Sequence, residues 1–223
     1  MKTTTTISLE VIPYTEYESK LPQEGNYILA QIDGEAIYVY QAFNHPIANY
    51  AVANQRFGGS AYSFSRMSWI KPNFLWMMYR AGWATKPNQE RILAIKMTLA
   101  GFIELLDAGV YSSYQPRLYS TRANWKAALA DSEVRIQWDP DHGPGGDKLN
   151  RRAIQIGIRG QLLVKFNEEF ILSISDVTDF VHQQRKRLEE EPQALRVIKE
   201  KVLNLDQTLL TKYAIPGHWP IAP

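Results

Sequence analysis

One aromatic segment of this 223-residue chain interleaves indole rings with cationic side chains. Trp69, Trp76 and Trp83 recur at intervals of seven residues, and Arg66 and Lys71 flank the first of them. Flat rings mixed with guanidinium and ammonium groups suit a planar, anionic ligand such as a nucleotide or a nucleic-acid base. The alternative is packing, because an aromatic stripe at helical spacing usually faces a core. We expect Trp76 to be buried and Trp69 to be the better candidate for a ligand platform.

The cations of this segment lie beside an expected helix start. Proline is favoured in the first turn of a helix, and glycine commonly ends one, so Pro72 and Gly82 predict a helix between them. Arg66 and Lys71 then lie just before or in its first turn, where backbone N–H groups favour anions. This arrangement predicts a phosphate site. The alternative is a solvated face with surface ion pairs.

Glutamine residues interrupt three apolar, strand-like stretches of the chain. They are Gln41, Gln137 and Gln155. Glutamine is disfavoured in strands and is costly to bury without hydrogen-bond partners. We therefore expect at least two of the three to line one polar cleft on a sheet, the alternative being solvent-facing alternation.

Two adjacent carboxylates, Glu168 and Glu169, precede the strand-like residues 170–174. Such a pair can supply a general base or stabilise a developing cation, although a charged loop is the more common explanation. The acidic loop at 139–147 matches no calcium-loop spacing, so we predict no metal site.

The elements that must position these residues indicate an α+β fold. We expect a single domain with a mixed or antiparallel central sheet flanked by helices, and a long C-terminal helix. The expected strands and helices follow from alternation, turn residues and helix caps. The strands are expected at 27–31, 36–43, 91–97, 134–138, 153–158 and 170–174, and the helices at 46–55, 72–82, 100–108, 120–129, 160–166 and 177–190. After Pro192 an amphipathic helix is expected to resume to about residue 210.

The expected organisation is an N-terminal arm (1–26), a core (27–182) and a C-terminal helical extension with a tail (183–223). The composition is that of a soluble globular protein, with 45% hydrophobic and 22% charged residues. A net charge of +2 leaves any nucleic-acid affinity to a local basic patch. Absence of cysteine excludes disulfides and thiolate catalysis and favours a reducing compartment. With no signal-peptide pattern and no long apolar run, the chain is predicted to be cytoplasmic, without a membrane partner.

Most of the chain resembles one known family, catalogued as domain of unknown function 4291. The matching segments are residues 39–42, 54–57, 66–83, 89–95, 134–140, 153–157 and 174–178. This resemblance implies which segments matter but no reaction. The order of elements is also similar to that of ADP-ribosyltransferases, in which NAD lies in a cleft between two small sheets. That similarity implies that Tyr40 lines the cleft, that Ser68 lies at the second motif, and that Glu169 or Glu168 is the catalytic acid, with NAD as the candidate cofactor.

The hypothesis we favour is an enzyme acting on a nucleotide-type substrate, either transferring ADP-ribose or modifying RNA. The alternatives are a non-catalytic nucleic-acid-binding module and a structural or partner-binding domain, with the long helix able to pair two copies as a homodimer. In the enzyme hypothesis Glu169 and Glu168 are catalytic. The ligand-binding candidates are Tyr40, Gln41, Arg66, Ser68, Trp69, Lys71, Tyr79, Gln137, Arg152 and Gln155.

Overall fold

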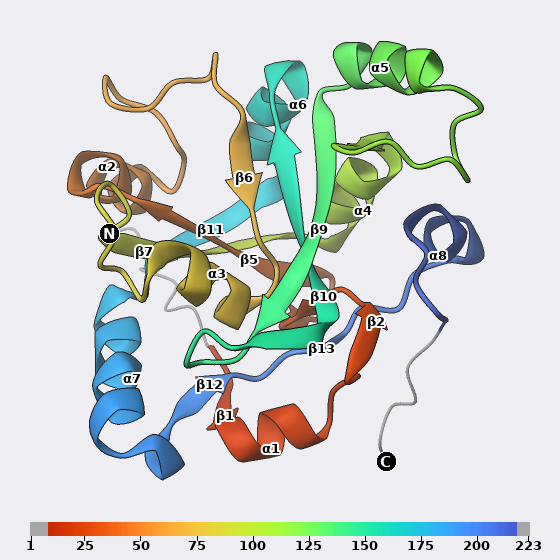
Figure 1. The fold of residues 1–223 in the computed structure, drawn as a ribbon. Coiled ribbons are helices and arrows are strands. Elements are labelled where there is room, and N and C mark those ends of the chain that lie inside the picture. Colours follow the sequence, from red (N-terminus) through yellow and green to blue (C-terminus); the bar gives the residue numbers. More distant parts are fainter. Residues whose placement is uncertain (1–8, 218–223) are drawn as a thin grey trace.

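Two β-sheets packed around a shared hydrophobic core form the centre of the molecule (Figure 1). The structure is a computed structural model and describes residues 9–217. The four-stranded sheet is antiparallel, in the order β11-β7-β5-β4. Its strands are β4 (Ile32–Asp33), β5 (Ala36–Phe43), β7 (Arg91–Thr98) and β11 (Ile171–Asp176).

The second sheet has five strands and is mixed. Its order is β2-β10-β9-β8, and β6 also pairs with β10, so that β2 and β6 use different ends of the same strand. Its strands are β2 (Glu24–Asn26), β6 (Ser68–Ile70), β8 (Gly109–Tyr111), β9 (Val134–His142) and β10 (Lys148–Ile158). The predicted α+β class with a mixed or antiparallel sheet is confirmed.

Helices cover both sheets, and two of them contact both at once. α3 (Phe74–Ala81) packs on β5 and β9 from the front of Figure 1, and α4 (Leu99–Ala108) packs on β7 and β9. The other helices are α1 (Tyr14–Ser19), α2 (His45–Asn54), α5 (Arg122–Asp131), α6 (Gly160–Lys165), the π-helical turn Phe166–Phe170, α7 (Thr178–Glu190) and α8 (Gln207–Tyr213). Within residues 9–217, none of the helices has the length and apolar character needed to cross a membrane.

Segments near both ends of the described chain pair with one another and pack in the same hydrophobic core. β1 (Val11–Pro13) pairs with β12 (Arg196–Ile198), and β3 (Leu29–Ala30) pairs with β13 (Lys201–Val202). Tyr17 is buried in the same hydrophobic cluster as the two sheets. The segments on either side of the 27–182 core therefore contribute buried side chains to it.

The expected helix after Pro192 is wrong. A short 3₁₀ turn, Pro192–Ala194, leads instead into strands β12 and β13, and the helix α8 begins only at Gln207. Tertiary pairing overrides helix propensity here, because both strands find partners in the N-terminal segment. The expected loop at 139–147 is also shorter than predicted, since β9 continues to His142.

Candidate functional site

A cavity of about 580 Å³ opens where the two sheets meet. Its floor is made by β5 of the four-stranded sheet and β6 of the five-stranded sheet. The main chains of Tyr40 and Lys71 join these strands, with N–O distances of 2.7 and 3.1 Å. The lining residues are Gln41, Ala42, Phe43, Asn44, Ile47, Ala61, Tyr62, Ser63, Arg66, Met67, Ser68, Trp69, Lys71, Met77, Asn88 and Gln89. The cavity thus collects four of the predicted ligand-binding residues from β6 and the residues around it, together with Gln41 of β5.

Gln41 is anchored by one end of its side-chain amide. Its Nε2 donates to Ser68 Oγ at 2.7 Å and to the carbonyl of Trp69 at 3.2 Å. Among the described residues its buried Oε1 has no hydrogen-bond partner. A buried acceptor without a partner is costly and rare, so this oxygen offers an unused acceptor beside the cavity.

The indole of Trp69 lies against β10 because the residue beneath it is a glycine. Gly157 is the cross-strand partner of Trp69. A Cβ atom built on Gly157 would lie 3.0 Å from the indole and 2.6 Å from the sulfur of Met67. The ring remains partly exposed and forms one wall of the cavity.

Lys71 is a buried cation without an acidic partner. It is 6% exposed, and within residues 9–217 no carboxylate oxygen lies within 4.0 Å of its Nζ. The hydrogen bond that its Nζ donates, to the Trp69 carbonyl, is long at 3.5 Å. Burial, followed by the charge of Arg80, lowers the pKa of Lys71 to about 8, and the charge of Asp139 opposes both effects. Its amine therefore exchanges a proton close to neutral pH.

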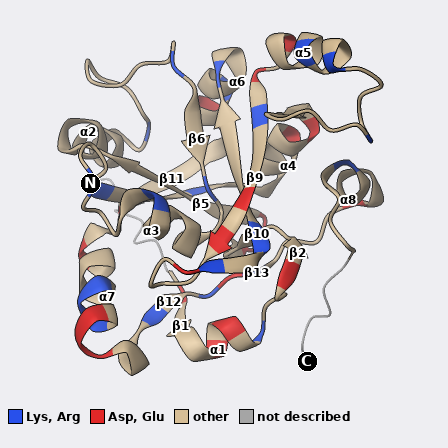
Figure 2. Ribbon diagram, in the orientation of Figure 1, with Lys and Arg blue, Asp and Glu red and all other residues tan. Residues whose placement is uncertain are grey.

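A polar strip crosses the five-stranded sheet next to Lys71. Gln155 of β10 faces Gln137 of β9, and continuing the β10–β6 register by one residue places Lys71 on the other side of Gln155. The two glutamines donate to the same carboxylate, Gln137 to Asp139 Oδ1 at 2.9 Å and Gln155 to Asp139 Oδ2 at 2.8 Å. Two of the three predicted glutamines therefore meet at Asp139. Neither of them lines the cavity, so among the three only Gln41 lies there. Figure 2 shows the charge along β9 changing from basic at its start to acidic at its end.

Tyr62, from the segment after α2, also lines the cavity and belongs to an aromatic cluster. Tyr62 stacks on Phe57 with ring centroids 5.0 Å apart and meets Phe43 and Phe64 edge-on. Burial raises the pKa of Tyr62, so its hydroxyl stays protonated. Arg66 is exposed at the rim of the cavity.

The remaining predicted ligand-binding residues lie elsewhere. Tyr40 is fully buried and packs edge-on against Phe74 in the core, because alternate side chains of β5 face opposite sides of the sheet. Tyr79 is 38% exposed and stacks on His142, away from the cavity-lining residues. Arg152 is exposed on β10, where that strand pairs with β2.

The predicted catalytic carboxylates are not part of this cavity. Glu168 and Glu169 lie in the π-helical turn before β11 and line a separate, shallower pocket of about 270 Å³, beside Lys165. Within the described chain, the lining of the larger cavity includes no aspartate or glutamate.

The start of α3 is occupied, but by an internal carboxyl group, that of Glu200. The helix begins at Phe74, later than predicted, and residues 68–70 form β6. The N–H of Phe74 donates to Glu200 Oε1 at 2.5 Å, and Asn73 caps the helix by accepting from the N–H of Trp76 at 2.6 Å. Lys71 therefore lies just before the helix, as expected, whereas Arg66 precedes β6, and the N–H of Phe74 at the helix start is taken by Glu200.

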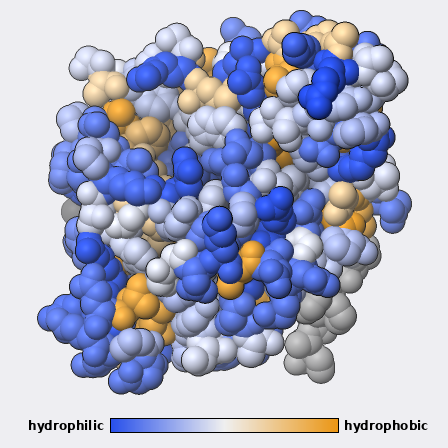
Figure 3. Space-filling view, viewed as in Figure 1, coloured by the Kyte–Doolittle hydropathy of each residue, from blue (hydrophilic) through white to orange (hydrophobic). Residues whose placement is uncertain are grey.

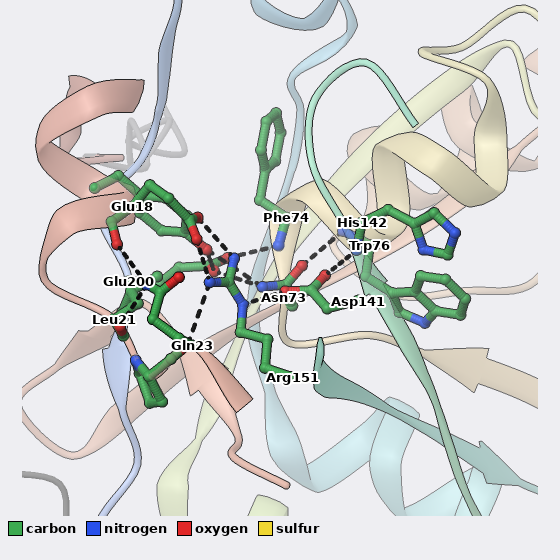
Figure 4. Close-up of polar contacts among 12 residues, drawn as sticks. Glu18, Leu21, Gln23, Asn73, Phe74, Trp76, Asp141, His142, Arg151 and Glu200 are labelled. Atoms are coloured by element: carbon green, nitrogen blue, oxygen red, sulfur yellow. Dashed lines mark hydrogen bonds and ion pairs between the residues drawn. The ribbon is translucent and has the colours of Figure 1, made fainter. Parts of the chain in front are cut away.

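Glu200 belongs to a buried polar cluster that the sequence patterns did not reveal (Figure 4). Tyr17 donates to Glu200 Oε2 at 2.7 Å, while Arg151, 1% exposed, bridges Asp141 at 2.6 Å and Glu18 at 2.7 Å. Burial raises the pKa of Glu200 to about 8 against the opposing effect of its hydrogen bonds. The members are distant in sequence and carry no local motif, so long-range packing alone brings them together.

Comparison with known proteins places most of the chain in one family. A family model described as Domain of unknown function (DUF4291) matches residues 27–203. A search of curated proteins found no match. The matched region contains every residue that lines the cavity.

Proposed function

The chain belongs to the DUF4291 family, and we propose that it is an enzyme acting on a nucleotide-type substrate bound in the cavity between its two sheets. The observation that carries this proposal is the charge of the cavity. Arg66 and Lys71 line it, and no carboxylate does so among the described residues. Such a cavity favours anionic ligands.

Lys71 supplies the strongest electrostatic argument. A charged group taken out of water without a counter-ion costs several kcal/mol, or shifts its pKa, and Lys71 shows the shift. A phosphate group entering the cavity would supply the missing negative charge. Arg66 at the rim is placed to hold a second anionic oxygen, and a guanidinium group suits that geometry.

The walls of the cavity suit a base or another planar group. The partly exposed ring of Trp69 offers a stacking surface. Gln41 Oε1 is an acceptor without a partner, and the Ser68 hydroxyl, which accepts from Gln41 Nε2, keeps its own proton to donate. A volume of about 580 Å³ lies in the range of small-molecule sites. Nucleotides, including NAD, combine a planar base with phosphates and therefore fit this set of groups.

Catalysis is supported by the titration of Lys71. A group whose pKa lies close to neutral pH can both take up and release a proton during turnover, and burial brings the pKa of Lys71 to about 8. Glu168 and Glu169 have no part in this proposal, because they line the other pocket.

Calorimetric titration of the purified protein with ADP, NAD and uncharged adenosine tests the proposal. We expect ADP or NAD to bind more tightly than adenosine, and we expect Lys71→Met to weaken that binding at least tenfold. Lys126→Met is the matched control, because Lys126 is exposed on α5 and lies outside the cavity lining.

Two outcomes would count against the proposal. Absence of binding by every nucleotide would reject it. Binding of oligonucleotides alone, with an affinity that falls steeply with salt, would favour the nucleic-acid-binding alternative.

A further inference from the structure

The amine of Lys71 is held in place by the junction of the two sheets. Both main-chain polar groups of Lys71 pair with Tyr40, and its neighbours Ile70 and Pro72 are buried. The side chain then reaches the cavity from a fixed Cα atom. A reacting group needs this kind of pre-organisation, since a displacement of about 1 Å can cost a hundredfold in rate.

Two charges act on this amine with opposite effects on its pKa. Arg80 of α3 favours the neutral form, and Asp139 of β9 favours the charged form. Asp139 is itself fixed by Gln137 and Gln155, whose amides donate to its two oxygens. The carboxylate that favours the charged form of Lys71 is therefore held in place.

Burial combined with a neighbouring cation is the established way to make a lysine nucleophilic near neutral pH. With a pKa of about 8, about a tenth of Lys71 is neutral at pH 7. Tyr62 also lines the cavity, but burial raises its pKa and keeps its hydroxyl protonated. Lys71 is accordingly the strongest candidate for a reacting nucleophile among the described lining residues.

We propose that Lys71 is a nucleophile that forms an imine with the open-chain aldehyde of a nucleotide whose terminal ribose carries no base, as in ADP-ribose. The amine lone pair attacks the aldehyde carbon, and the electron pair of the C=O bond moves to oxygen. After proton transfer from nitrogen to oxygen, one water molecule leaves and a C=N bond remains. Hydrolysis reverses the step, so neither an oxidant nor a reductant is required. The inference rests on the proposed function, because it places the aldehyde in the same cavity. The protonated amine of Lys71 binds the phosphate of a ligand such as ADP, whereas the neutral form of the same amine attacks the aldehyde of ADP-ribose, whose diphosphate is then held by Arg66.

Reductive trapping tests this inference on the full chain. ADP-ribose and cyanoborohydride, which reduces the imine to a stable amine, are added at pH 7, and the modified lysines are identified by peptide mass spectrometry. We expect the adduct at Lys71 to form at least tenfold faster than at the exposed Lys86 and Lys126 of the same molecules. An excess of AMP should suppress the Lys71 adduct and spare the surface lysines.

Two variants test whether the neighbouring charges determine the rate of reductive trapping at Lys71. Arg80→Gln should slow trapping at pH 7, because it removes the cation that favours the neutral amine. Asp139→Asn should accelerate it for the opposite reason. Equal rates in both variants and the wild type would contradict the assigned roles of these charges.

The outcomes separate this inference from the proposed function. If ADP-ribose binds with an affinity that depends on Lys71 but labels that residue no faster than surface lysines, the imine is rejected and nucleotide binding stands. If ADP-ribose, ADP and NAD neither bind nor label, both proposals fail. Trapping in the wild type requires no substitution, so a destabilised variant cannot obscure the result.

Discussion

Lys71 and Glu200 are two buried ionisable groups at the short segment that connects β6 to α3. The segment leaves β6 at Ile70 and enters α3 at Phe74. Lys71 faces the cavity, whereas the N–H of Phe74 points to Glu200. One turn of chain therefore separates a cation that lacks an acidic partner from a helix N-terminus that is occupied by a buried carboxyl group.

Glu200 should make the stability of the protein fall as pH rises. Its folded-state pKa is about 8, against an ordinary value of 4.5, so between those values the folded state holds a proton that the unfolded state has released. The free energy of unfolding then decreases with pH across that window. In Glu200→Gln the amide stays neutral, and its oxygen can still accept from the N–H of Phe74. We expect urea midpoints between pH 5 and 8 to fall more in the wild type than in Glu200→Gln, and equal slopes would contradict the buried, protonated carboxyl.

Arg151 should be essential for stability. Replacement by methionine leaves the buried Asp141 without its cation and removes both bonds to Glu18. Removal of one partner of a buried ion pair costs about 3–5 kcal/mol. Urea unfolding should show a loss of this size for Arg151→Met.

Arg185→Met is the matched control for that experiment. Arg185 forms an i,i+4 pair with Glu189 on the surface of α7, and such pairs contribute about 0.3–0.5 kcal/mol. Similar losses in the two variants would contradict the structural role assigned to Arg151.

At the scale of elements, the register between β6 and β10 positions the cavity wall. Gly157→Ala should weaken nucleotide binding at least tenfold, because the added Cβ would meet Met67 and the indole of Trp69. Overpacking of this kind also costs about 1–3 kcal/mol in stability. Gly145→Ala is the control, since the nearest atom to its added Cβ lies 3.6 Å away. Calorimetric titration of both variants with ADP would measure the effect, and unchanged binding by Gly157→Ala would show that Trp69 does not contact the ligand.

The elements were predictable from the sequence where local rules decide them. Alternation and turn residues located β5, β7 and β10, and Gly82 ended α3 as expected, in a left-handed conformation. The start of α3 was placed two residues early, at Pro72, although Asn73 is a local capping residue. Only the second partner of this helix end, Glu200, lies far away, 126 residues along the chain. β12 was missed because its pairing partner, β1, lies far away in the sequence.

The candidate site was predictable in part. The glutamines of β9 and β10 meet because cross-strand partners face the same side of a sheet. Gln41 and Trp69 meet at the cavity because β5 and β6 are joined by the Tyr40–Lys71 pairing, for which the sequence holds no signal. Glu168 and Glu169 had suitable chemistry, but only tertiary packing determined that they line a different pocket.

At the scale of the whole molecule, the chain on both sides of the 27–182 core should be required for folding. A fragment spanning the family match, residues 27–203, would lack Tyr17 and Glu18, which bind Glu200 and Arg151. It would also lack Tyr213, whose hydroxyl donates to the carbonyl of Leu106 at 2.5 Å. We expect this fragment to show no cooperative thermal transition, whereas residues 9–217 should unfold in one step.

Circular dichroism and calorimetry of the two fragments would measure this difference. A 27–203 fragment that melts at the same temperature as the longer one would show that the flanking segments are accessory. Figure 3 shows apolar residues in scattered patches on this face of the molecule.

The most direct test of the account is a crystal structure of the protein with ADP bound. We expect ADP to lie in the cavity between β5 and β6, with its phosphates within hydrogen-bond distance of Lys71 Nζ and the Arg66 guanidinium, and with its base against Trp69. ADP bound in the pocket beside Glu168 and Glu169, or an empty cavity at a saturating ADP concentration, would contradict it.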